Sequence, residues 1–165
     1  MSDPVRGDVS EVEDGPEYAL DFREHPGRYR HTSDKRGAFK IEPYKSELLP
    51  DWTVATLPEA ETAAATLQEQ YRGYRADDDF VGMDMTRKYL QMGWTRAMRY
   101  AKYPGGQKYE RDEDGTRVER EPQEWYDDEK RDIALVYREH LDTVRADPAY
   151  EAAKRRHRER YAEDP

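Results

Sequence analysis

Apolar residues recur every three or four positions through most of the chain after Trp52, which is the spacing of amphipathic helices. Polar residues and prolines mark where these helices begin. Thr56 and Glu59 have the spacing of a capping box, and Asp147 followed by Pro148 places an N-cap before a first-turn proline. The pattern predicts four helices, over about residues 57–74, 80–103, 122–145 and 148–161.

The part of the chain before these helices has a different pattern. Within residues 28–41, two short runs at 29–31 and 38–41 flank a polar turn at 32–37, which predicts a β-hairpin. Residues 1–17 are rich in acids, proline and glycine, and we expect a disordered tail because burying them could not repay the entropy lost on ordering them. The predicted fold is therefore mainly α, a small helical domain of about four helices with a minor N-terminal β-hairpin. We expect one domain over residues 18–146 and a charged C-terminal helix over 147–165.

One stretch interrupts the helical pattern. Residues 110–132 hold eleven acids and five bases around Gly115, and we expect the first half of this stretch to be a solvated loop.

The composition limits what the protein can be. The chain has 165 residues, of which 35% are hydrophobic and 39% are charged, so we expect one domain with a small core in which 13 tyrosines supply much of the buried area. The absence of cysteine excludes disulfides, thiolate catalysis and cysteine-ligated metals. No apolar run is long enough to span a bilayer and no secretory signal pattern is present, so we expect a cytoplasmic protein. Proteins of halophiles carry excess negative charge, so a net charge of −9 favours a halophilic source, with an ordinary acidic cytosolic protein as the alternative.

Positive charge is concentrated in two tyrosine-rich stretches of this acidic chain, which we call the basic islands. Residues 22–45 carry seven bases and three acids, and residues 83–109 carry six bases and one acid. Cations neutralise phosphates and aromatic rings stack on unpaired bases, so the islands predict an anion-binding surface and favour nucleic acid. The predicted phosphate-binding residues are Arg87, Lys88, Arg96, Arg99, Lys102, Lys108, Lys40 and Lys45, and the predicted stacking residues are Tyr44, Trp94 and Tyr103.

The predicted helix over residues 80–103 separates apolar from cationic positions. Its apolar face carries Met83, Leu90, Trp94, Ala97 and Ala101. The opposite stripe carries Asp84, Lys88, Gln91, Thr95, Arg99 and Lys102, and we expect that stripe to meet an anion. Arg87 falls within the apolar arc, where a buried guanidinium needs either a ligand phosphate or an internal acid such as Glu42 or Asp84.

Other chemistry has little support in the sequence. The four histidines lack metal-ligand spacing, helix capping explains the acids at 77–79 more simply than a Mg²⁺ site, and no glycine-rich phosphate loop occurs. We therefore predict no catalytic residue, no metal and no cofactor, and the sequence favours binding over catalysis.

Three hypotheses remain. The first is a non-enzymatic nucleic-acid-binding accessory protein, and the acidic remainder of the chain argues against wide duplex binding. The second is an enzyme or sensor for a phosphorylated small molecule or nucleotide, with Arg87, Arg99 and Lys45 as a clamp and a concave pocket where the islands meet. The third is a structural or interaction protein without a ligand, in which every basic side chain has an internal carboxylate partner. The sequence leaves the oligomeric state open.

Two segments resemble a known family. Residues 39–52 (FKIEPYKSELLPDW) and 82–109 (GMDMTRKYLQMGWTRAMRYAKYPGGQKY) are similar to the family labelled domain of unknown function 4385, found in bacteria, archaea and phages. The likeness covers about residues 22–145. It implies that the two basic islands belong to one compact unit, and it implies no particular activity.

Overall fold

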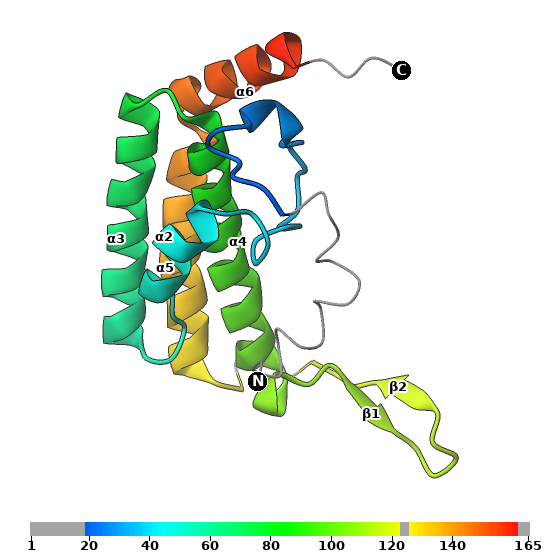
Figure 1. Cartoon of the computed structure of the whole chain (residues 1–165). Helices are drawn as coiled ribbons and strands as arrows, with labels where there is room; N and C mark the ends of the chain where they lie inside the picture. Colours follow the sequence, from blue (N-terminus) through cyan, green and yellow to red (C-terminus); the bar gives the residue numbers. More distant parts are fainter. Residues whose placement is uncertain (1–18, 123–125, 162–165) are drawn as a thin grey trace.

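The computed structural model describes residues 19–122 and 126–161, and these residues form a mainly helical domain (Figure 1). The predicted acidic tail at 1–17 lies outside the described residues. Within them, five α-helices and one two-stranded antiparallel sheet confirm the predicted fold class. The helices are α2 (Tyr44–Leu48), α3 (Leu57–Ala76), α4 (Phe80–Lys102), α5 (Asp128–Arg145) and α6 (Pro148–Arg160).

Side-chain caps set the first residues of the long helices. The Thr56 hydroxyl accepts a hydrogen bond from the N–H of Glu59 at 3.3 Å, as the capping pattern predicts. The Asp147 carboxylate likewise accepts from Ala149 at the start of α6. The third long helix begins later than predicted, at Asp128, because Asp127 is its N-cap.

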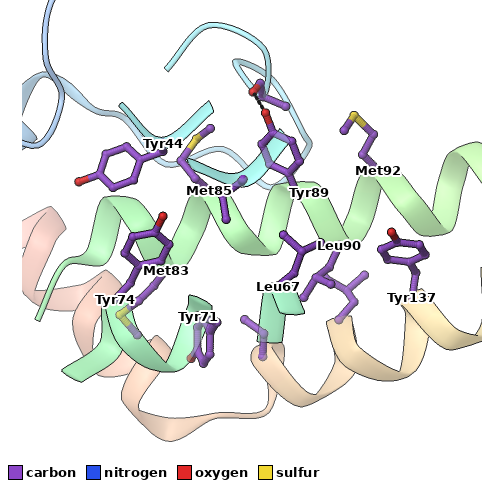
Figure 2. Packing of buried hydrophobic residues seen from close by; sticks show 14 of the residues in the cluster. Tyr44, Leu67, Tyr71, Tyr74, Met83, Met85, Tyr89, Leu90, Met92 and Tyr137 are labelled. Carbon is purple, nitrogen blue, oxygen red and sulfur yellow. Dashed lines mark hydrogen bonds between the residues drawn. The ribbon is translucent and has the colours of Figure 1, made fainter. Parts of the chain in front are cut away.

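Helices α3, α4 and α5 lie side by side, and α6 lies across one end of them (Figure 1). Their contacts form a core rich in tyrosine and methionine, shown in Figure 2. Gly93 of α4 allows the close contact with α5, because a Cβ there would come within 2.4 Å of the Tyr137 ring. The buried tyrosine hydroxyls keep hydrogen-bond partners, as in the 2.7 Å bond from Tyr137 to the carbonyl of Thr53.

The predicted N-terminal hairpin is wrong in its position. Residues 28–41 form turns rather than strands, because they lie against α4 and their carbonyl groups bond to α4 side chains. One example is the 2.6 Å hydrogen bond from the Tyr89 hydroxyl to the carbonyl of Ala38. This segment therefore bonds to helix α4 instead of to a partner strand.

The hairpin instead lies in the acidic stretch that was predicted to be a loop. Strands β1 (Tyr109–Arg111) and β2 (Arg117–Glu119) pair antiparallel and project from the helices (Figure 1). The turn between them is stabilised by Asp112, whose carboxylate accepts hydrogen bonds from two backbone N–H groups, and by Gly115 at φ 80°. All six strand residues are exposed, so no alternation of apolar and polar residues marked them as strands.

Every helix among the described residues is too short or too polar to cross a membrane.

Candidate functional site

A buried polar network joins the N-terminal segment to α4 and α6. Its centre is Asp84, which is fully buried in the first turns of α4. The Asp84 carboxylate accepts hydrogen bonds from the hydroxyls of Tyr29 and Tyr150 at 2.5 and 2.6 Å, and from Nδ1 of His31 at 3.0 Å. Burial disfavours the charged carboxylate, but the His31 hydrogen bond and the charge of Arg87 keep the pKa of Asp84 well below its usual value.

Arg87 completes this network. Its Nε and Nη2 atoms bond to the Asp84 carboxylate at 3.0 and 2.9 Å, and Nη1 bonds to the carbonyl of Asp34 at 2.7 Å. Burial alone would lower the pKa of Arg87, but the negative charge of Asp84 outweighs it and raises that pKa. Of the two roles that the sequence left open for Arg87, the structure therefore shows the internal salt bridge, with Asp84 as the acid. All five guanidinium donors have protein acceptors, so Arg87 is not placed for a ligand clamp.

Several other predicted site residues point into the protein. The amino group of Lys88 donates to the carbonyl of Arg36 and lies 4.9 Å from the centre of the Tyr29 ring. Burial lowers the pKa of Lys88 to about 8. Among the remaining predicted residues, the ring of Tyr44 is fully buried, and Lys40 and Tyr103 are also buried.

Burial by the N-terminal segment accounts for these placements. The wheel of α4 put Asp84 and Lys88 on a stripe that should face an anion, but residues 28–41 cover that stripe along the first half of the helix. A helical wheel separates apolar from polar positions and contains no information about which other segment will cover the polar ones.

The second half of α4 carries exposed positive charge where the two islands meet. We call Lys35, Arg96, Arg99 and the neutral Thr95 the cation cluster. The Lys35 amino group, from the first island, donates to the Thr95 hydroxyl of the second island at 2.8 Å. Burial, and then the positive charges of Arg96 and Arg99, lower the pKa of Lys35, which shows that the three cations lie close together. Lys102 lies one turn beyond Arg99 on the same helix.

Within residues 19–122 and 126–161, the cation cluster has no carboxylate counter-ion. The sequence contains no acid between Asp84 and Glu110, so this part of α4 supplies none. Among the described residues, no carboxylate forms an ion pair with Lys35, Arg96 or Arg99. The nearby acid that acts on Lys35, Asp34, is itself 3.6 Å from Arg36. The pairing that the structural hypothesis requires is therefore not met at these positions.

Two tryptophans, Trp52 before α3 and Trp94 on α4, each contact an arginine. The Arg96 guanidinium lies 5.7 Å from the centre of the Trp52 ring, whose Nε1 donates to the carbonyl of Tyr89 at 3.0 Å. The predicted stacking residue Trp94 has the Arg138 guanidinium 4.5 Å from its ring centre. These contacts restrain the arginine side chains.

The last two predicted phosphate-binding residues lie on other elements. Lys45 is on the short helix α2, and Lys108 directly precedes β1. Of the predicted residues, Arg96, Arg99 and Lys102 lie on the second half of α4, whereas Lys35 was not among the residues predicted. The signal that could have indicated Lys35 was its position in the first island.

A hollow lies elsewhere on the molecule. Its volume is about 810 Å³, and it is lined by Arg23, residues 77–81 and the end of α6, but by no member of the cation cluster. Within the described part of the chain, no group of three histidine, aspartate or glutamate side chains is placed to hold a metal ion.

Comparison with known proteins gives one result. A family model described as Domain of unknown function (DUF4385) matches residues 13–160. The match confirms the resemblance seen in the sequence and is longer than expected, because it takes in α6. No curated protein and no solved structure matches the chain.

Proposed function

The chain belongs to the DUF4385 family, and we propose that it is a non-enzymatic nucleic-acid-binding protein that holds backbone phosphates on the cation cluster. The observation that carries the proposal is the meeting of the two basic islands at Lys35 and Thr95, beside two arginines that form no ion pair with a carboxylate in the part of the chain that the structure describes. A phosphate would supply a negative charge to pair with these cations.

The electrostatics of Lys35 support an anion as the missing partner. Its amino group is half-buried and repelled by Arg96 and Arg99, so holding its charge costs free energy in the absence of a ligand. A bound anion would attract the Lys35 ammonium group and so offset its repulsion by Arg96 and Arg99. Charge-assisted hydrogen bonds from lysine and arginine to phosphate are also stronger than neutral ones.

The charge of the whole protein favours a single strand over a duplex. A net charge of −9 repels nucleic acid from most of the surface, so binding is confined to the cluster and its surroundings. A flexible single strand can follow so small a patch, whereas a stiff duplex would bring distant phosphates toward acidic surface.

The buried network supports binding rather than catalysis. Asp84, Arg87 and Tyr29 are committed to one another in a site closed to solvent, so their perturbed pKa values are explained by the architecture. Their function in this proposal is to hold the N-terminal segment, and with it Lys35, against α4.

The test is a binding assay with variants matched in charge. Anisotropy of a labelled single-stranded oligonucleotide would be measured at low salt with the unaltered chain and with an Arg96→Gln, Arg99→Gln double variant. The matched control is Arg155→Gln, Arg158→Gln, which removes two exposed charges from α6. We expect the α4 variant to lose most of the affinity and the α6 variant to retain it. Equal losses would mean that net charge alone matters, and an unaltered chain that does not bind would reject the proposal.

A further inference from the structure

The donors of the cation cluster come from two segments of the chain, which meet at the hydrogen bond between Lys35 and Thr95. Thr95 and Arg99 are four residues apart on α4, so their side chains lie one above the other on the same face of the helix. Arg96 lies beside them, and Lys35 reaches this face from the turn before Gly37. A row of cations suits successive phosphodiesters, whereas convergent cations suit one highly charged group.

Contacts within the protein hold the cluster in place before any ligand binds. The Thr95 hydroxyl accepts from Lys35 at 2.8 Å and itself donates to the carbonyl of Met92 at 3.4 Å. The Lys35 ammonium group has three N–H donors, and Thr95 accepts from one of them in the described part of the structure. Arg96 is restrained by its contact with the Trp52 ring. Restrained side chains lose less entropy on binding, so such a cluster can discriminate between similar anions.

The number of charges points to a phosphate with two of them. A phosphodiester carries one negative charge, but a phosphomonoester carries about −1.5 to −2 at neutral pH, and it offers three strongly accepting oxygens. Lys35, Arg96 and Arg99 together supply three positive charges, and no carboxylate in the described ranges 19–122 and 126–161 forms an ion pair with them. We infer that the cation cluster binds a phosphomonoester, carried on the end of a nucleic-acid strand.

This inference rests on the proposed function and names the part of the nucleic acid that the cluster recognises. Lys102, one turn further along α4, is placed for an adjacent backbone phosphate. The terminal phosphate would then be held by the convergent groups and the next linkage by a single, less restrained cation. The same phosphomonoester chemistry occurs in free nucleotides and in inorganic phosphate, so the experiment includes both.

The experiment compares two labelled single strands of identical sequence, one with a 5′-phosphate and one with a 5′-hydroxyl. With the full-length protein at fixed salt, we expect the phosphorylated strand to bind about tenfold more tightly, equivalent to one additional charge-assisted interaction. Lowering the pH below about 6 protonates the phosphomonoester, so the preference should shrink while binding of the 5′-hydroxyl strand changes less.

Two variants test which residues provide the preference. Thr95→Val removes the hydroxyl that positions Lys35, and Lys35→Gln removes the charge itself. Both should bring the two affinities together, and Arg158→Gln on α6 should leave the preference unchanged. Thermal unfolding confirms that each variant folds, and the Lys35→Gln result is decisive if Thr95→Val is unstable.

The outcomes separate this inference from the proposed function. Equal affinity of the unaltered protein for the two strands overturns the inference and leaves nucleic-acid binding intact. Absence of binding to either strand overturns both. A nucleoside 5′-monophosphate or inorganic phosphate is added as a competitor for the site. Competition at concentrations similar to those at which the phosphorylated strand binds would reject the strand end as the ligand. Competition only at far higher concentrations supports it.

Discussion

The salt dependence of strand binding gives a quantitative test of how many cations hold phosphates. Each phosphate contact on a single strand releases counter-ions and contributes about 0.7 to the slope of log affinity against log salt. Lys35, Arg96, Arg99 and Lys102 are the four exposed or half-buried cations at the junction of the islands. On a 5′-hydroxyl strand, where each of the four would neutralise a separate backbone phosphate, the slope is about −2.8, and raising the salt from about 50 to about 200 mM weakens binding about 50-fold.

Removing one cation should change this slope by a known amount. Arg99→Gln eliminates one contact, so the slope should become shallower, about −2.1. The loss of affinity over the same salt range should then be about 20-fold. Arg99 is exposed and makes no ion pair among the described residues, so the substitution leaves the fold intact. The assay is anisotropy of a labelled strand at several salt concentrations, with Arg158→Gln on α6 as the control. An unchanged slope for Arg99→Gln, or an equal change for the control, would refute the assignment of a phosphate contact to Arg99.

Three further predictions concern the fold that presents the cluster. Asp84→Asn leaves Arg87 buried without its counter-charge and should lower the free energy of unfolding in urea by about 3–5 kcal/mol. The pKa of Asp84 is lowered, so its contribution to stability is complete above about pH 5 and decreases as the pH falls further, and the variant should lose this acid sensitivity. Burial lowers the pKa of Lys88 to about 8, so between about pH 8 and pH 10 the unfolded chain binds a proton that the folded chain does not. The free energy of unfolding should therefore rise with pH over this range, by at most about 1.4 kcal/mol per pH unit relative to Lys88→Met. Gly93→Ala places a methyl group 2.4 Å from the Tyr137 ring and should cost about 1–3 kcal/mol.

Two control variants and two contradicting outcomes accompany these predictions. Gly73→Ala on α3 meets no atom within 4 Å and should stabilise the helix by about 0.5–1 kcal/mol. Arg99→Gln should change stability by less than about 0.5 kcal/mol, since the side chain is exposed. An Asp84→Asn variant as stable as the unaltered chain would show that the buried network does not hold the N-terminal segment. Parallel stability curves for Lys88→Met and the unaltered chain above pH 8 would contradict the assigned burial of the ammonium group.

The helices could be predicted from the sequence because their ends depend on local chemistry. Thr56 and Asp147 cap the backbone of residues two or three positions away, so the signal and the structure lie in the same short segment. Residues 28–41 show the opposite case. Their hydrogen bonds go to the side chains of Arg87, Lys88 and Tyr89, about fifty residues away, and no local pattern records that.

The candidate site was predictable in part for the same reason. The sequence shows that bases are concentrated in two islands, and the surface where Lys35 meets α4 joins these islands. The sequence did not distinguish Lys88, which is buried under the N-terminal segment, from Arg99, which is exposed on the same stripe. Both are cations on one helical face, and only the path of residues 28–41 separates their roles.

The arrangement links the stability of the fold to the proposed activity. The Asp84 network holds the N-terminal segment against α4, and that segment carries Lys35 to Thr95. Asp84→Asn should therefore weaken strand binding as well as stability, although Asp84 is fully buried and cannot contact the strand.

Mapping the bound strand on the protein by NMR tests the central claim most directly. Backbone amide shifts would be recorded while a 5′-phosphorylated single strand is added to the full-length protein. The account predicts that the largest changes fall on residues 33–37 and on the second half of α4, around Thr95 and Arg99. Changes centred on α6 or on the hairpin, or no changes at all, would contradict it.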